Sequence, residues 1–251
     1  MYTDGSLGAR TAWMKKPYAD APDTTGVPVY DKEVFFALAV QSHRNGMPFI
    51  THAIGDAGVE LVLDAIEYAR KQVPGTDDLP DGIVHCQITS AEQLERITKM
   101  GVHVYAQPVF VEYDLHICKD RVGEELAKTS YNWKTLLDKG VCISSGSDCP
   151  VESLSPAGNI YCAVTRKDYE GKPENGWLPD QRLTIEEALR CHTVLAAKTV
   201  GKADRMGCIR KGYLADLSIY PRDFAEIPAE EILHQKPIMI VVGGRERKCG
   251  E

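Results

Sequence analysis

Two histidines and an aspartate stand at equivalent positions in successive segments of this sequence. His52 ends the apolar stretch "GMPFITH", His85 ends "GIVH", and Asp148 follows "VCISSGS". Imidazole nitrogens and a carboxylate oxygen together suit zinc or a similar divalent ion. The three residues are far apart in the sequence, so no local metal motif joins them. The prediction of a metal site therefore depends on their shared structural position.

The segments that carry these residues alternate between apolar runs and helical patterns. Runs near 47–51, 82–85, 102–106 and 141–145 predict four strands, and amphipathic stretches such as "SAEQLERITKMG" predict helices between them. Strands that alternate with helices indicate an α/β fold with a parallel sheet, and their apolar character indicates that helices cover the sheet. Because the carboxyl ends of parallel strands meet at one rim, His52, His85, Gln107 and Asp148 are expected to converge there.

Local signals predict where the helices begin and end. Asp31 and Asp56 are expected as N-caps, with a role for Asp56 in supporting a metal ligand as the second interpretation. Ser90 and Gln93 have the spacing of a capping box. A glycine stands before each predicted strand, where a positive φ is expected: Gly46, Gly82, Gly101 and Gly140.

Each of these residues also has an ordinary structural explanation. A single histidine after a strand is more often a hydrogen-bonded structural residue than a metal ligand. The five histidines outside the pattern are interpreted in this way: His43, His103, His116, His192 and His234. Cys86 and Cys149 flank the proposed ligands but have no base at a fixed spacing, so they are expected to be small buried residues.

The bulk composition narrows the classes of function. The chain has 251 residues, 26% of them charged, and a formal net charge of -7, which argues against a nucleic-acid partner. Its apolar runs are shorter than the roughly 20 residues that cross a bilayer, so no membrane partner is expected. Eight cysteines without C-x-x-C spacing indicate reduced thiols in a cytoplasmic protein.

Several motifs together resemble a known family. They are "DGSLGARTA", "THAIGD", "IVHCQ", "SGSDCPV", "LTIEEALRCHTVLAAKTVG" and "GCIRKGYLADLSIY". In their order and spacing, from Asp4 to about Tyr220, they resemble the amidohydrolase superfamily and specifically its family 3, which includes enzymes similar to N-substituted formamide deformylase. The resemblance implies a metal-dependent hydrolase of carbon–nitrogen bonds other than peptide bonds, with a small amide-like substrate.

The resemblance also implies a fold and a set of site residues. Residues 1–205 would be the C-terminal half of a (β/α)₈ TIM-type barrel, and residues 206–251 part of a small β-sandwich. His52, His85 and Asp148 would bind zinc or another divalent metal, as one or two ions, with Asp148 also the catalytic general base. Asp4 and Gln107 are assigned to substrate binding, and "FVEYDLHICKDRVGEE" is expected to hold the substrate or cover the site.

The sequence departs from the family pattern in two ways. It contains no H-x-H motif, and the family lysine that lies four residues before the aspartate of "DGS" would fall before Met1. The chain is therefore expected to be a fragment, the product of a gene model that starts at an internal methionine, or a degenerate relative. It is predicted to be incomplete and inactive by itself. The alternative is a non-catalytic pseudoenzyme or regulatory protein that retains the fold. A homo-oligomer, in which two half-barrels complete one sheet, is also expected.

Overall fold

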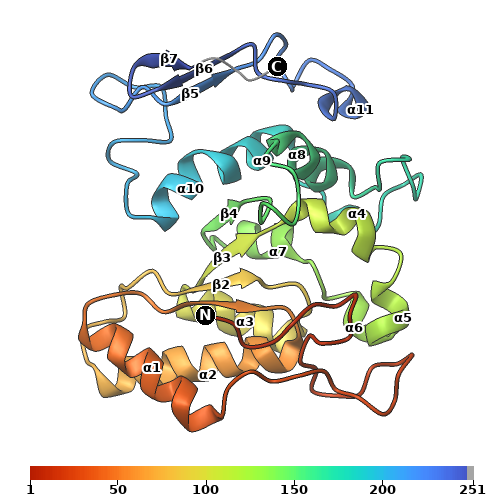
Figure 1. Cartoon of the computed structure of the whole chain (residues 1–251), viewed down its shortest axis with the longest axis vertical. Helices are drawn as coiled ribbons and strands as arrows, with labels where there is room; N and C mark the ends of the chain where they lie inside the picture. The colour runs from red at the N-terminus through yellow and green to blue at the C-terminus, as the bar shows by residue number, and fades with distance from the viewer. Residues whose placement is uncertain (248–251) are drawn as a thin grey trace. The chain divides into compact units, whose positions relative to one another are not determined.

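The computed structural model describes residues 1–247 (Figure 1). The chain divides into two compact units, each assembled from two stretches of chain. The first unit contains residues 1–106 and 113–142. The second contains residues 107–112 and the chain from residue 143 onward. The predicted division at residues 205 and 206 into a barrel part and a sandwich part stays a prediction.

The first unit contains a parallel sheet, as the sequence predicts. Its strands are β1 (Ile50–Ala53), β2 (Gly82–His85) and β3 (His103–Ala106). β1 pairs with β2 and β2 with β3, both in parallel. On the other side of β1, Tyr2 forms a parallel bridge to His52, whose backbone N–H donates to the Met1 carbonyl at 2.9 Å. The predicted α/β fold is confirmed, and β1 has backbone partners on both sides.

Helices connect these strands and cover the sheet of the first unit. The long ones are α1 (Lys32–Arg44), α2 (Asp56–Gln72) and α3 (Ala91–Met100), followed by the short α5 (Cys118–Val122), α6 (Glu124–Ala127) and α7 (Trp133–Asp138). α4 (Val111–Asp114) spans one boundary between the two units. α2 lies beside α1 (Figure 1). It also packs against β1 and buries Val59, Leu63 and Ile66 completely. Burial of apolar side chains at about 25 cal/mol per Å² is what stabilises this layer.

The predicted helix signals are largely confirmed. Asp31 is the N-cap residue of α1, although its side chain makes no capping bond, and Ser90 and Gln93 form the predicted capping box of α3. The prediction for Asp56 is wrong by one position, because Gly55 is the N-cap of α2. Asp56 is instead the first helical residue, and its carboxylate accepts the Lys15 backbone N–H at 2.8 Å.

Three of the four glycines have the predicted conformation. Gly46, Gly101 and Gly140 have φ values of 67°, 65° and 84°. The prediction for Gly82 is wrong, because this residue begins β2 with an extended backbone. A Cβ atom at Gly82 would lie 2.4 Å from the Tyr105 ring, so here glycine provides room for a neighbouring side chain.

A buried ion-pair network lies at the start of β1 and β2. Asp81 directly precedes β2, and its carboxylate contacts His43 Nε2 at 2.9 Å, Arg70 Nη2 at 2.8 Å and the Phe49 backbone N–H at 2.8 Å. The side chains of His43 and Asp81 are fully buried, and that of Arg70 is 11% exposed. The structural interpretation of His43 is confirmed, because its ring pairs with the Asp81 carboxylate inside the fold.

The second unit combines helices with a short antiparallel sheet. It begins with the 3₁₀ turn η1 (Pro108–Phe110) and continues through β4 (Ile143–Ser145), α8 (Pro156–Thr165), η2 (Pro179–Gln181), α9 (Ile185–His192), α10 (Val194–Thr199) and α11 (Ala229–Ile232). β5 (Leu217–Ile219) pairs with β6 (Met239–Val242), which pairs with β7 (Arg245–Arg247). Within residues 1–247, no helix has the length and apolar character that would let it cross a membrane.

Candidate functional site

The structure brings His52 and His85 together at the carboxyl ends of two neighbouring strands. His52 stands opposite Val84 and Ala53 opposite His85, so the two histidines occupy staggered positions of a parallel pair. Their ring centroids are 4.5 Å apart at an angle of 75°. Two imidazoles at this distance are close enough for both to reach one ion, because zinc–nitrogen bonds are about 2 Å long.

Asp4 is buried beside the first of these histidines. Its carboxylate accepts backbone N–H bonds from Trp13 at 2.9 Å, Ile54 at 3.1 Å and Gly55 at 2.7 Å. Asp4 Oδ1 also lies 3.2 Å from His52 Nδ1. The Asp4 side chain is fully buried, so its partners in this structure are groups of the protein. The predicted contact of Asp4 with substrate stays a prediction.

The backbone around His85 adopts an uncommon conformation. His85 and Cys86 both have positive φ, at 73° and 51°, a region that residues with a side chain seldom occupy. The Trp133 indole N–H donates to the carbonyls of both residues at 3.2 Å and supports this turn. Burial raises the pKa of the Cys86 thiol to about 12, so the thiol stays protonated at neutral pH. Cys86 is thus the small buried residue that the sequence predicts.

Asp148 and Gln107 belong to the second unit. Asp148 follows β4 and has a φ of 58°, the same left-handed region as His85. Strained backbone of this kind persists where the surrounding structure holds it and is enriched at functional sites. Gln107 ends the predicted third strand and is 6% exposed, with its Oε1 buried and unbonded in the described part of the chain. The prediction for Cys149 is wrong, because this thiol is exposed.

A metal site needs more ligands than the two histidines. Over residues 1–247, no group of three or more His, Cys, Asp and Glu side chains is arranged to hold an ion. The observation that fits a divalent metal is narrower. Two imidazoles lie beside each other, and the first of them, His52, lies 3.2 Å from a buried carboxylate without a hydrogen bond between the two groups.

A polar network near His85 was not predicted from the sequence. Gln87 Nε2 donates to Asp114 Oδ2 at 2.9 Å, and the Tyr131 hydroxyl donates to the same oxygen at 2.6 Å. Burial raises the pKa of Asp114, while these two hydrogen bonds oppose the rise. Two features of the sequence could have indicated this network. Gln87 lies two residues after His85, and Asp114 lies in the segment expected to hold substrate.

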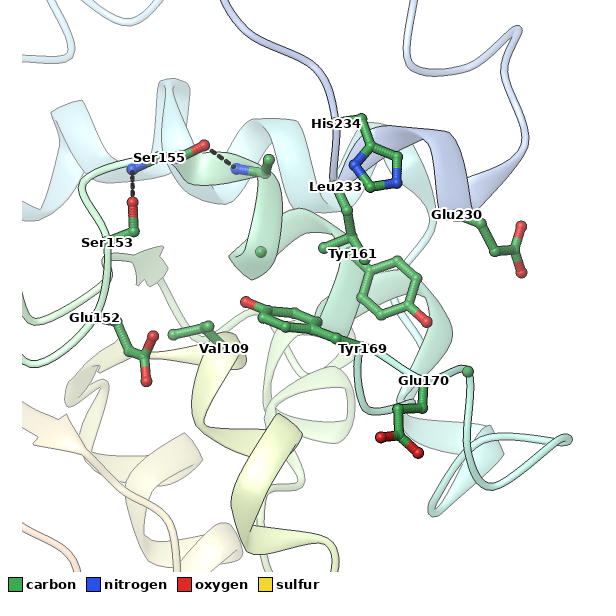
Figure 2. Close-up of a pocket in the computed structure, with 13 residues that line it drawn as sticks. Val109, Glu152, Ser153, Ser155, Tyr161, Tyr169, Glu170, Glu230, Leu233 and His234 are labelled. Carbon is green, nitrogen blue, oxygen red and sulfur yellow. Dashed lines mark hydrogen bonds between the residues drawn. The ribbon is translucent and has the colours of Figure 1, made fainter.

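The second unit contains a cavity of about 500 Å³ (Figure 2). The rings of Tyr161 and Tyr169, with centroids 6.0 Å apart, lie beside each other, and the carboxylates of Glu152, Glu170 and Glu230 lie around them. The remaining lining comes from Val109, Ser153, Ser155, Ala157, Gly158, Gly171, Leu233 and His234. This lining has three acidic side chains and no lysine or arginine, so the cavity favours a neutral or cationic group over an anion.

His192, which is interpreted as structural, provides a prediction about pH. Burial lowers the pKa of His192 to about 4, and its Nε2 is buried without a hydrogen bond in the described chain. The unfolded imidazole has a pKa of about 6.5, so below that pH the unfolded chain binds a proton that the folded chain does not. The free energy of unfolding should therefore fall between about pH 6.5 and pH 4, by at most about 3.4 kcal/mol from this group.

The measurement is urea unfolding of the chain and of His192→Gln at several pH values in this window. The variant should have a shallower pH dependence than the wild type. His116→Gln, in which the replaced side chain is exposed, is the control and should keep the wild-type slope. Equal slopes in wild type and His192→Gln would contradict the prediction.

Comparisons with known proteins identify a family and several relatives of this chain. A sequence profile described as "Amidohydrolase family" matches residues 1–247. The chain is 36% identical to YtcJ of Bacillus subtilis (strain 168), over 92% of this chain and 43% of that protein. It is 28% identical to N-substituted formamide deformylase of Arthrobacter pascens, over 87% of this chain and 40% of the enzyme.

A solved structure is similar as well. A metal-dependent hydrolase from Pyrococcus horikoshii OT3, itself uncharacterized, matches with a TM-score of 0.77 and 33% identity, over 91% of this chain and 45% of that one. The chain thus spans less than half the length of each of these relatives.

Proposed function

The chain belongs to the amidohydrolase family, and on that basis we propose that it serves the metal-dependent hydrolysis of a carbon–nitrogen bond other than a peptide bond. The observation that carries the proposal is the pair of imidazoles, His52 and His85, at the ends of adjacent parallel strands. Imidazole is a preferred ligand of zinc and of similar divalent ions. We also propose that residues 1–205 form half of a (β/α)₈ barrel and residues 206–251 part of a β-sandwich. The chain is further proposed to form a homo-oligomer.

His52 and His85 would hold the ion, with Asp148 as a further ligand. When bound, a divalent ion supplies Lewis-acid activation of water and of the substrate carbonyl. Asp148 is proposed to accept the proton of the attacking water and to deliver it to the leaving nitrogen. Zinc is the metal that this donor set favours first.

The cavity of the second unit is proposed to bind a neutral or cationic group. Val109 lies two residues after Gln107, and Glu152 lies four residues after Asp148, so the chain connects this lining directly to both predicted site residues. Tyrosine faces and carboxylates would hold a neutral or cationic amide. Gln107, with its buried and unbonded Oε1, is proposed to donate a hydrogen bond to the substrate or to accept one from it.

The chain by itself is proposed to lack turnover. Catalytic zinc operates with three protein ligands and a water, but among residues 1–247 no three candidate ligands are arranged to hold an ion. Even the loss of hydrogen-bonding support around a metal ligand typically lowers affinity or activity 10–100-fold. The 251 residues are therefore proposed to bind a metal weakly and to leave amides intact.

Metal binding is the test of this function. The purified, metal-free chain is titrated with Co²⁺, and binding is followed by visible absorption and by calorimetry. His52→Gln and His85→Gln should each lower the affinity at least about tenfold, because each removes a ligand. His116→Gln, an exposed histidine, is the control and should bind as the wild type does. Binding that is unchanged in both ligand variants would refute the proposed site.

Turnover is measured separately on N-substituted formamides and simple amides. With zinc, the chain should hydrolyse them no faster than the metal-free control. Zinc-dependent turnover that is lost in Asp148→Asn would show that this chain is active by itself, and would support the role of Asp148 while contradicting the predicted inactivity.

A non-catalytic protein that retains the fold is the second candidate. It is favoured by the absence, within residues 1–247, of a side-chain group that could hold a metal with three ligands. In that case the Co²⁺ titration should show no binding that depends on His52 or His85.

A further inference from the structure

We infer that the cavity of the second unit binds a protonated primary amine, through its carboxylates and one accessible aromatic ring. The inference narrows the neutral or cationic group of the proposed function to one class of cation. It rests on that part of the proposed function and not on the metal site. The cavity volume of about 500 Å³ lies within the range of about 300–1,000 Å³ that is usual for small-molecule sites. All of the lining residues belong to the second unit, so the site depends on one compact part of the chain alone.

Three carboxylates of the lining have no cationic partner. Glu152, Glu170 and Glu230 make no ion pair within residues 1–247, whereas other exposed carboxylates, such as those of Glu124 and Glu125, pair with a lysine. Figure 2 shows the three side chains around the same cavity. Like charges around one cavity repel one another, so a cation placed between them is stabilised by each.

One aromatic ring of the lining is accessible, and a second ring supports it. Tyr169 is 47% exposed, whereas Tyr161, with its ring centroid 6.0 Å away, is 1% exposed. The Tyr161 hydroxyl donates to the Asp168 carbonyl at 2.9 Å, which anchors the buried ring. A cation within about 6 Å of the face of a tyrosine ring is attracted to it, so Tyr169 adds to the effect of the carboxylates.

This lining favours a primary amine over a quaternary ammonium group. A quaternary group has no N–H and is typically recognised by a cage of several aromatic faces. The cavity instead offers one accessible ring and three carboxylates, which accept charge-assisted hydrogen bonds from an ammonium group. Leu233 and the Tyr169 ring provide apolar surface for a short hydrocarbon chain.

The positive end of α8 does not reverse this preference. α8 begins beside the cavity, where the Ser155 hydroxyl accepts the Ala157 N–H at 3.3 Å (Figure 2). A helix N-terminus carries about half a positive charge, and a proton on His234 would add one more. The three carboxylates still leave the lining net negative. Burial raises the pKa of the Tyr161 hydroxyl, and the charge of Glu230 adds to the rise, so the negative charge acts inside the cavity.

The test is a titration of the chain with n-butylammonium chloride. Binding is followed by calorimetry and by ¹H–¹³C spectra of tyrosine-labelled protein, in which the Tyr169 signals are identified by their loss in Tyr169→Leu. We expect saturable binding that shifts the Tyr169 signals. n-Butanol, which has the same hydrocarbon chain and no charge, should bind at least about threefold more weakly, because it gains nothing from the charge of the carboxylates.

A combined variant tests the carboxylates. Replacement of Glu152, Glu170 and Glu230 by glutamine should weaken the binding of n-butylammonium at least about threefold. The matched control has the same change of net charge on exposed glutamates outside the lining, and it should bind as the wild type does: Glu33→Gln, Glu186→Gln and Glu226→Gln. Equal weakening in both variants would overturn the inference, because it would indicate attraction to the net negative charge of the whole chain.

Gly158→Ala tests the aromatic ring without removing a side chain. A Cβ atom at Gly158 would lie 2.3 Å from the Tyr169 hydroxyl oxygen, so the Tyr169 ring must shift. Because Gly158 lies inside α8 and alanine favours a helix, the fold should persist. Gly158→Ala and Tyr169→Leu should each weaken binding about two- to fivefold, the size of a cation–π contact. Unchanged affinity in both variants would exclude the ring from the site and overturn the inference.

The outcomes separate this inference from the rest of the proposed function. If n-butanol binds as tightly as n-butylammonium, the choice of a cation is wrong and a neutral ligand remains for the cavity. If neither binds saturably, the cavity part of the proposed function is refuted as well. Neither result affects the Co²⁺ titration of His52 and His85, so a failure of the metal site is distinguishable from a failure of the amine site.

Discussion

Asp81→Ala is expected to lower the free energy of unfolding by about 3–5 kcal/mol, the range for removing one partner of a buried ion pair. Asp81 accepts from His43, Arg70 and the Phe49 backbone N–H inside the fold. Its loss leaves the nearly buried guanidinium and the backbone donor without their acceptor. Because Phe49 and Asp81 directly precede β1 and β2, the damage would reach the strands that carry both histidines.

Urea unfolding followed by circular dichroism measures this change. Glu125→Ala is the control, because Glu125 also takes part in an ion pair, with Lys128, but its side chain is 89% exposed. Exposed pairs of this kind contribute little to stability, so the control should unfold as the wild type does. A loss of less than about 1 kcal/mol in Asp81→Ala would show that the buried network is not needed for the fold.

Gly55→Ala is expected to lower the free energy of unfolding by about 3 kcal/mol, at the upper end of the usual range for an overpacked site. A Cβ atom at Gly55 would lie 2.1 Å from the Trp13 carbonyl oxygen and 2.5 Å from its carbon. These are backbone atoms, so no side chain can rotate away to relieve the overlap. The turn must shift, and with it the Gly55 N–H that donates to Asp4.

Gly146→Ala provides the comparison for this second substitution. A Cβ atom at Gly146 meets nothing within 4 Å, and the residue does not have a positive φ. Its stability should stay within about 0.5 kcal/mol of the wild type, as for ordinary surface substitutions. The expectation fails if Gly55→Ala unfolds at the same urea concentration as Gly146→Ala.

The regular elements could be predicted because each has a local cause. Apolar runs that end in His52 and His85 placed two strands to within a few residues, and the spacing of Ser90 and Gln93 gave a capping box that the structure contains. The adjacency of the two histidines also followed, since it requires only that consecutive strands pair in parallel. Local sequence patterns were therefore sufficient to predict the strands, the capping box and the adjacency of the two histidines.

The contacts of the site depend on residues that are distant in the sequence. Asp4 meets the turn at Gly55 across 51 positions, and Gln87 meets Tyr131 across 44. Neither pair has a periodic or spacing signal, because the contacts arise only when separate loops close over the sheet. Gly82 was misjudged for the same reason, since the ring that requires a glycine there belongs to Tyr105 on the next strand.

The path of the chain limits how this protein can be dissected. The polypeptide passes from one compact unit to the other three times, after residues 106, 112 and 142. A shortened chain that stops at residue 142 would keep η1 but lose α8, and the Val109 N–H would lose its acceptor, the Asn159 side chain, 3.0 Å away. No single cut yields two self-contained pieces, so a fusion partner or protease site is better placed at the ends of the chain than between its units.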